Sequence, residues 1–172
     1  SSLTGVYIAD LAAWCNIDFG DDYANPLYYA HNLYLNGSEI QGAVVVPAGV
    51  TSIGKYAFYY CDQITSVTIP DSVTTIGGDA FDNTAWYKNQ PDGLIYAGNV
   101  AYKYKGNCPA TVAIKEGTLG IAEYAFWGCT SLTSIEIPDS VTSIGSYAFS
   151  GCTALTSITF GGSVAQWQAV EK

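Results

Sequence analysis

Short runs in which apolar and polar residues alternate recur along the chain. One run places Ile64, Val67 and Ile69 at its apolar positions. The equivalent positions of two further runs are Leu132, Ile135, Ile137 and Leu155, Ile158, Phe160. This alternation predicts a short β-strand with one inward and one outward face. The segments that follow are short and rich in Gly and Ser, so we expect turns there, with a helical or 3₁₀ turn at residues 56–58 and their copies.

The runs belong to a repeat whose period is marked by phenylalanine. The interval from Phe58 to Phe81 equals that from Phe126 to Phe149, and the interval between Phe81 and Phe126 is almost double, so one turn is lengthened by nearly a full period. Each unit has about five inward apolar side chains, and burial of each one stabilises the fold by roughly 1.5–3 kcal/mol. Ordering the backbone opposes this gain by roughly 1–2 kcal/mol for every residue of the unit. One unit therefore cannot fold alone. We expect stacked turns that form a solenoid, with the four phenylalanines in one continuous buried stack.

The amino-acid sequence of the repeat resembles that of a known family. The sequence Ile-Pro-Asp-Ser-Val-Thr-Ser-Ile-Gly at residues 137–145, followed by Tyr-Ala-Phe and Gly-Cys-Thr, is similar to the BspA-like class of leucine-rich repeat. The resemblance is close over residues 44–81 and 112–160. It implies a bacterial secreted or cell-surface protein that adheres to or binds other molecules, and it supplies no catalytic motif. The predicted fold is a right-handed leucine-rich-repeat solenoid of short parallel strands with two inserted β-hairpins.

We interpret residues 1–172 as one fragment of a longer repeat array. Its parts are an irregular extended repeat at 10–42, regular repeats at 43–84 and 112–160, an insertion at 85–111 and a truncated repeat at 161–172. Asn36-Gly37 predicts one hairpin and Gly98-Asn99 predicts the other. Residues 10–17 and 162–170 each predict the start of an apolar-faced helix. An export signal and an anchor are expected outside this fragment.

Charge excludes two classes of partner. Fifteen acidic residues against six lysines and no arginine give a formal charge of −9, which repels phosphate backbones and anionic membranes. No run of eighteen apolar residues is present. We therefore expect neither nucleic-acid binding nor direct membrane insertion, and we expect the fragment to be monomeric.

The five cysteines are interpreted as packing residues. Cys61, Cys129 and Cys152 share one column with Thr84, which indicates a small, weakly hydrogen-bonding side chain rather than a bond. Strands stacked about 4.8 Å apart also hold Cβ atoms farther apart than the roughly 3.8 Å that a disulfide prefers. Buried, reduced thiols are expected, with a Cys129–Cys152 disulfide or metal binding as the alternatives. Cys15 and Cys108 are assigned to packing as well.

No group of residues in the sequence indicates catalysis or a bound cofactor. His31 is the single histidine, lies in an aromatic run and has no nucleophile motif to serve, so a structural role is expected. The acidic residues at 18–22 do not fit the spacing of a calcium loop and are interpreted as a solvated loop. We predict that the protein is not an enzyme and holds no metal. A glycan-active enzyme is a remote alternative, because it would need a convergent carboxylate pair.

Aromatic residues outside the repeat columns are the first candidates for binding, since exposed rings stack on sugars and also anchor protein contacts. Packing onto the solenoid is the alternative for many of them, and the column residues Tyr56, Tyr124 and Tyr147 are assigned to structure. The candidate ligand-binding residues are Tyr28, Tyr29, Trp86, Tyr87, Tyr96, Tyr102 and Tyr104.

The outward strand face is a second candidate surface, with small and nearly uncharged side chains and no aromatic anchor. Its candidate residues are Ser66, Thr68, Thr111, Ser134, Glu136, Ser157 and Thr159, with Ala43, Val45 and Ala113 beside them. Such a face predicts weak contacts that combine by avidity. The predicted function is a binding or adhesion module for a host or microbial protein or glycan, and the alternative is a structural spacer that projects another domain.

Overall fold

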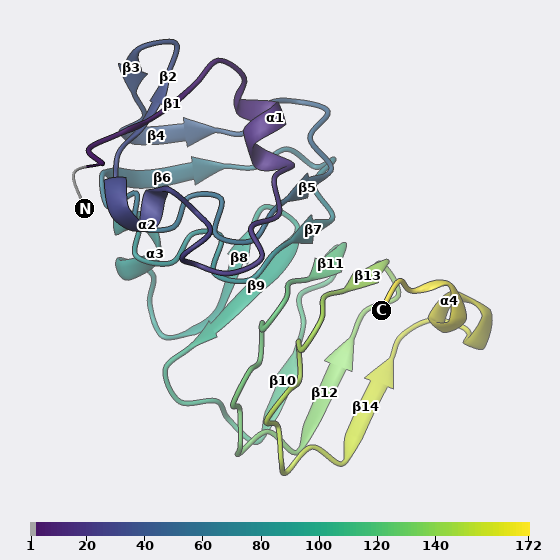
Figure 1. The fold of residues 1–172 in the computed structure, drawn as a ribbon. Coiled ribbons are helices and arrows are strands. Elements are labelled where there is room, and N and C mark those ends of the chain that lie inside the picture. Colours follow the sequence, from purple (N-terminus) through teal and green to yellow (C-terminus); the bar gives the residue numbers. More distant parts are fainter. Residues whose placement is uncertain (1–2) are drawn as a thin grey trace. The chain divides into compact units, whose positions relative to one another are not determined.

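The computed structural model describes residues 3–172 and divides into two compact units. Unit 1 contains the described residues up to Val73 together with Gly77–Gln90, and unit 2 contains Thr74–Ile76 together with Pro91–Lys172. Both are built from successive repeat turns with short parallel strands (Figure 1). The predicted leucine-rich-repeat solenoid is therefore confirmed as the fold class.

The elements are short because each side of a turn holds only a few residues. Those of unit 1 are β1 (Val6–Ile8), α1 (Leu11–Cys15), α2 (Leu27–Ala30), β2 (Leu33–Leu35), β3 (Ser38–Glu39), β4 (Gly42–Val45), β5 (Ser52–Ile53), β6 (Ile64–Thr68) and α3 (Ala85–Lys88). Those of unit 2 are β7 (Thr75–Ile76), β8 (Gly93–Ala97), β9 (Val100–Lys105), β10 (Thr111–Ala113), β11 (Gly120–Ile121), β12 (Ser134–Ile137), β13 (Ser143–Ile144), β14 (Ser157–Phe160) and α4 (Val164–Ala169).

The main strand ladder has the register that the repeat predicts. In unit 1, β4 and β6 are parallel, with Val45 opposite Thr68. In unit 2, β10, β12 and β14 lie side by side (Figure 1), and Thr111, Ser134 and Ser157 form one rung. The predicted outward positions are exposed, except that Ser134 is half-buried.

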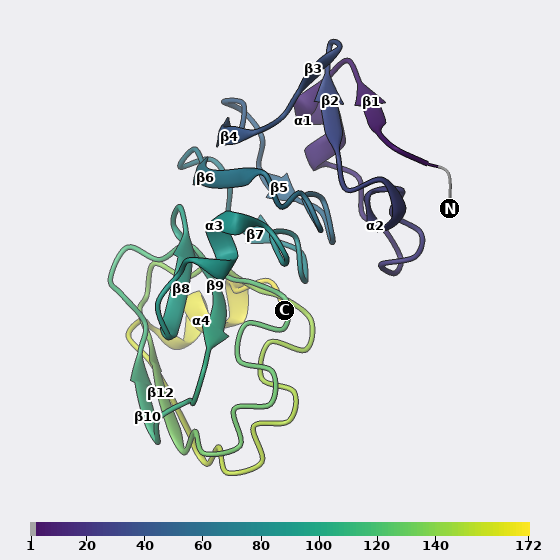
Figure 2. The ribbon, with the colours of Figure 1, turned by 90° about the vertical axis from the view of Figure 1, so that its left-hand side faces the viewer.

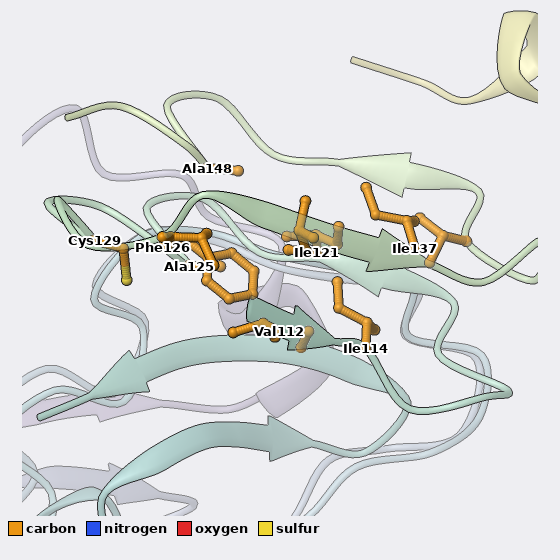
Figure 3. Close-up of a cluster of buried hydrophobic side chains, with 12 residues drawn as sticks. Val112, Ile114, Ile121, Ala125, Phe126, Cys129, Ile137 and Ala148 are labelled. Atoms are coloured by element: carbon orange, nitrogen blue, oxygen red, sulfur yellow. The ribbon is translucent and has the colours of Figure 1, made fainter. Parts of the chain in front are cut away.

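Each unit contains part of the phenylalanine column. In unit 1 the rings of Phe58 and Phe81 are stacked, 5.4 Å apart and both buried. In unit 2 the ring of Phe126 lies 5.4 Å from that of Phe149. Phe126 is fully buried in a core of aliphatic side chains between the turns (Figure 3), but Phe149 is only half-buried. The predicted stacking is thus present within each unit, and burial is incomplete at Phe149.

The segment around each column phenylalanine is a series of hydrogen-bonded turns. The N–H groups of residues 57, 59 and 61 donate to the carbonyl oxygen three residues earlier, as in a 3₁₀ turn. The N–H groups of residues 56, 58 and 60 donate instead to carbonyl oxygens 78, 80 and 82 of the next turn. This alternation needs left-handed backbone at two places, and Tyr56 and Tyr60 have φ of 59° and 61°.

The two predicted hairpins are both present. β2 and β3 are antiparallel about Asn36-Gly37, and in Figure 2 β2 also lies beside its parallel neighbour β1. β8 and β9 are antiparallel, with Ala97 opposite Val100. The two expected helix starts are α1 and α4, where the side chains of Asp10 and Ser163 cap the N-termini. Among residues 3–172, no helix has the length and apolar character needed to cross a membrane.

The segment at 85–111 does more than lengthen a turn. β9 pairs in parallel with β11, with Val100 opposite Gly120. The N–H of Tyr104 donates to Ala125 O at 2.7 Å, the bond that Phe126 makes to Ala148 in the following turn. The Tyr104 ring lies 6.2 Å from that of Phe126. Tyr104 therefore occupies a place in the phenylalanine column, and the inserted residues supply a repeat turn of their own.

Candidate functional site

Aromatic side chains gather on the surface of unit 1 where the extended repeat meets the turn at 54–61. We call this group the aromatic cluster; it comprises Tyr23, Tyr28, Tyr29, His31, Tyr56, Tyr59 and Tyr60. Ring centroids of neighbouring members are 4.5–5.8 Å apart, from Tyr59 and Tyr60 at 4.5 Å to Tyr28 and Tyr60 at 5.8 Å. Tyr23 and Tyr29 are 62% and 45% exposed, so the cluster presents ring faces to solvent.

The buried side chain of Asn25 holds the two halves of the cluster together. Its amide nitrogen donates to Tyr56 O at 2.6 Å, and its amide oxygen accepts from the N–H of Leu27 at 2.9 Å. The first bond fixes the turn that carries Tyr59 and Tyr60, and the second fixes the start of α2, which carries Tyr28. Trp14 adds a similar link, since its Nε1 donates to Ala57 O at 2.7 Å.

Three members of the cluster, Tyr56, His31 and Tyr60, have left-handed backbone that ordinary side chains avoid. His31 has φ of 61° and Tyr60 has φ of 61°, and their rings are stacked 5.0 Å apart. The positions equivalent to Tyr60 in later turns are Asn83, Gly128 and Gly151, all with positive φ. A tyrosine is thus held in a conformation that glycine adopts without cost, which is the kind of local strain that occurs at functional sites.

Carboxylates lie beside the aromatic cluster. The pKa of Tyr28 is raised, chiefly because its hydroxyl is hydrogen-bonded to that of Tyr23. The pKa of Tyr59 is also raised, first by burial and then by Tyr60, Asp22 and Asp79. The hydroxyls of Tyr28 and Tyr59 therefore stay protonated at neutral pH. The arrangement offers ring faces, hydroxyl donors and carboxylate acceptors in one patch.

The predicted aromatic candidates separate into two groups. Tyr28 and Tyr29 belong to the aromatic cluster and remain predicted binding residues. Trp86 packs edge-on against Phe81 at 5.3 Å, and Tyr87 is half-buried beside it in α3.

The three candidates in unit 2 are mainly structural. Tyr102 is only 1% exposed and is a core side chain. Tyr104 packs on Phe126, and the hydroxyl of Tyr96 accepts a hydrogen bond from the N–H of Lys115 at 2.9 Å. Their assignment to an exposed binding surface was therefore wrong for Tyr102 and is not favoured for Tyr96 and Tyr104. Tyr104 packs against the core of unit 2, because β9 belongs to a repeat turn.

Sequence reasoning missed five members of the cluster. Tyr56 was assigned to a structural column and His31 to a structural role. Tyr23 was grouped with the aromatic residues outside the columns but not chosen as a candidate, and neither Tyr59 nor Tyr60 was considered. One signal was available for the last two. The equivalent pairs in later turns are Asp82-Asn83, Trp127-Gly128 and Ser150-Gly151, so Tyr59-Tyr60 departs from polar or glycine-containing pairs.

The outward strand face has an aromatic pair that was not expected. Tyr7 of β1 and Tyr34 of β2 are register partners, and their rings are stacked 4.6 Å apart. Tyr7 is 70% exposed. The predicted strand-face residues have small and nearly uncharged side chains, as expected: Ser66, Thr68, Thr111, Ser134, Glu136, Ser157 and Thr159.

Other candidate chemistry is sparse in the part of the chain that the structure describes. All five cysteines are free thiols. Residues 3–172 contain no group of three or more His, Cys, Asp or Glu side chains placed to hold a metal ion. In the acidic loop, Asp18 and Asp21 accept backbone hydrogen bonds from Lys55 and Ala24.

Comparison with known structures gives distant similarities. A leucine rich cell surface protein from Faecalibacterium prausnitzii is 23% identical over 77% of this chain and 63% of its own, with a TM-score of 0.36. The pneumococcal vaccine antigen PcpA is 16% identical over 74% and 44%, with a TM-score of 0.40. A leucine rich repeat protein from T. pallidum is 22% identical over 73% and 54%, with a TM-score of 0.32. The chain thus spans less than two thirds of each of these proteins.

Comparison with families is more definite. No curated protein matches the chain. The family model of the BspA type leucine rich repeat region matches it in six copies, over residues 32–108 and 98–169. These matches cover most of the sequence and run through the segment at 98–108, where the structure shows the extra turn. The chain belongs to the BspA-type leucine-rich repeat family.

Proposed function

We propose that this chain is a non-catalytic binding module of a bacterial cell-surface protein, and that the aromatic cluster binds neutral carbohydrate. The observation that carries the proposal is the gathering of seven aromatic side chains on one surface of unit 1, with Tyr23 and Tyr29 well exposed. A surface location agrees with the similarity to the F. prausnitzii protein, which is a leucine rich cell surface protein.

The chemistry of the cluster favours sugars. Pyranose rings present C–H faces that pack on aromatic rings, and their hydroxyls need both donors and acceptors. The tyrosine hydroxyls supply donors, and the carboxylates of Asp22 and Asp79 lie close enough to Tyr59 to raise its pKa. The ring faces and the hydrogen-bonding groups therefore occur together, as carbohydrate recognition requires.

Charge narrows the class of carbohydrate. The chain has a formal charge of −9 and no arginine, and two carboxylates border the cluster. Sulfated or sialylated glycans would meet repulsion that no nearby arginine fork offsets. Neutral glycans avoid this cost, so they are the favoured ligands.

The experiment measures binding to a glycan array for the parent chain and for one variant, whose substitution is taken from later turns of the repeat. The array contains neutral glucans, mannans and galactans, with sulfated and sialylated glycans as comparators. Tyr60→Gly removes a central ring while introducing the residue that two later turns carry at this place, Gly128 and Gly151, where φ is positive. Relief of left-handed strain offsets part of the lost ring packing, so the variant is expected to fold. Binding to the neutral glycans should fall at least tenfold.

Tyr147→Ala is the matched control. Tyr147 occupies the same column as Tyr56, has φ of 56° and is 64% exposed, but it lies in unit 2 and stacks only on Tyr124 among the aromatic contacts described. Binding should survive this change. A second control replaces Ser134 and Glu136 of the strand face by Ala. Loss of binding in the strand-face variant alone would place the site there, and absence of glycan binding by the parent chain would favour the structural spacer.

A further inference from the structure

Unit 2 brings three thiols into successive turns of one column. Cys129 and Cys152 are separated by the regular repeat interval, whereas Cys108, in the turn that contains Tyr104, precedes Cys129 by slightly less than this interval. Cys129 is part of the unit 2 core, and Cys108 and Cys152 pack against it. The column therefore contains one regular step and one irregular step.

The irregular step places two thiols near each other. Cys108 packs against the core that contains Cys129, and both residues line one surface pocket, whereas the thiol of Cys152 donates to Phe126 O at 3.1 Å. Backbone hydrogen bonds fix the two segments on either side of this pair. Tyr104 N donates to Ala125 O at 2.7 Å, and Thr133 N donates to Ala110 O at 2.7 Å.

We propose that Cys108 and Cys129 form an intramolecular disulfide by exchange with a small-molecule disulfide. The argument that excludes a disulfide between regular turns depends on parallel side chains about 4.8 Å apart, and it does not apply to a pair offset from the repeat interval. Because hydrogen bonds already hold both segments together, closing the bond requires little movement of the backbone.

An oxidant can reach the pair from outside. Cys108, Cys129 and the indole of Trp127 line a surface pocket of about 200 Å³, and Trp127 is 68% exposed. Burial raises the pKa of both thiols, so the reactive thiolate is scarce at neutral pH and the exchange is slow. Cys108 is half-buried and Cys129 is buried, which makes Cys108 the thiol that reacts first with the small disulfide.

The reaction balances in two steps. The Cys108 thiolate attacks one sulfur of the small disulfide, which leaves a mixed disulfide and releases one small thiol. The Cys129 thiolate then attacks the Cys108 sulfur, forming the protein disulfide and releasing the second small thiol. The protein loses two thiol protons and two electrons, and the small disulfide gains both as two thiols.

The test uses the intact chain with excess hydroxyethyl disulfide. Free thiols titrated in denaturant should fall from five to three, without a covalent dimer on a non-reducing gel. Peptide mapping should join the fragment with Cys108 to that with Cys129. The oxidised chain should also unfold at a higher temperature than the reduced chain, because the bond restricts the unfolded state.

Two serine variants locate the bond. Cys152→Ser should still lose two thiols, and Cys108→Ser should lose none. A cross-link that maps to Cys129 and Cys152, five thiols that persist after prolonged incubation, or a reaction that stops at the mixed disulfide would each overturn the proposal. Mapping of the parent chain decides the question even if a variant fails to fold.

Discussion

Asn25 is the residue on which the geometry of the aromatic cluster most depends. It is fully buried and uses both ends of its amide, with Tyr56 O at 2.6 Å and Leu27 N at 2.9 Å. Asn25→Ala removes the acceptor of the Leu27 N–H in the interior and one of two hydrogen bonds to Tyr56 O, which still accepts from Tyr59 N. A buried polar group left without its partner costs about 1–3 kcal/mol. We expect a matching loss in the free energy of unfolding by urea denaturation. Asn107→Ala, at an exposed position, is the control, and a loss below about 0.5 kcal/mol at Asn25 would contradict this role.

At the residue scale, part of the site could be predicted and part could not. Tyr28 and Tyr29 were found because they lie outside the repeat columns. Tyr60 was missed because Phe58 and Cys61 beside it match the repeat columns, and its left-handed backbone is indicated in the sequence only by the glycines at 128 and 151. Asn25 gave no signal at all, since the bond from its amide nitrogen joins segments that lie far apart in the sequence.

The repeat turn, as an element, depends on its column phenylalanine. Phe126 is fully buried and contacts rings on both sides, with Tyr104 at 6.2 Å and Phe149 at 5.4 Å. Phe126→Ala removes these contacts and leaves a cavity, so it should cost about 3–5 kcal/mol. Phe149→Ala should cost less, because this ring is only half-buried. Chemical denaturation checks both values; a loss under about 1 kcal/mol at Phe126 would contradict the assigned register.

At the element scale, strand register was predictable because two periods fix it, and the hairpins were predictable from their turn residues. Alternation decides which side chains face outward, and the repeat interval decides which residues form a rung, such as Thr111, Ser134 and Ser157. The extra turn was not predicted. Tyr104 replaces phenylalanine and the thiol at Cys108 is displaced from the regular interval, so the sequence does not display this turn as a copy.

At the scale of the whole molecule, burial of the thiols makes the free energy of unfolding depend on pH in the alkaline range. Burial raises the pKa of Cys61 from 9.0 to about 12, and burial followed by Asp10 raises that of Cys15 to about 11. In the unfolded chain both thiols ionise near their ordinary value of 9.0. Between that value and the folded pKa, the unfolded state binds fewer protons than the folded state. The contribution of these thiols to the free energy of unfolding should therefore be constant below about pH 9 and fall above it.

Urea denaturation between about pH 7 and pH 10.5 measures this slope, which should approach about 1.4 kcal/mol per pH unit for each thiol. Tyr59 adds to the fall only above about pH 10, where an ordinary tyrosine begins to ionise. The matched variant is Cys61→Thr, because Thr84 occupies the same column and is fully buried there. This variant should lose less stability than the parent chain between about pH 9 and pH 10. If the two slopes are equal, Cys61 is not protected from ionisation by the fold, and its burial in the repeat core is not what controls alkaline stability.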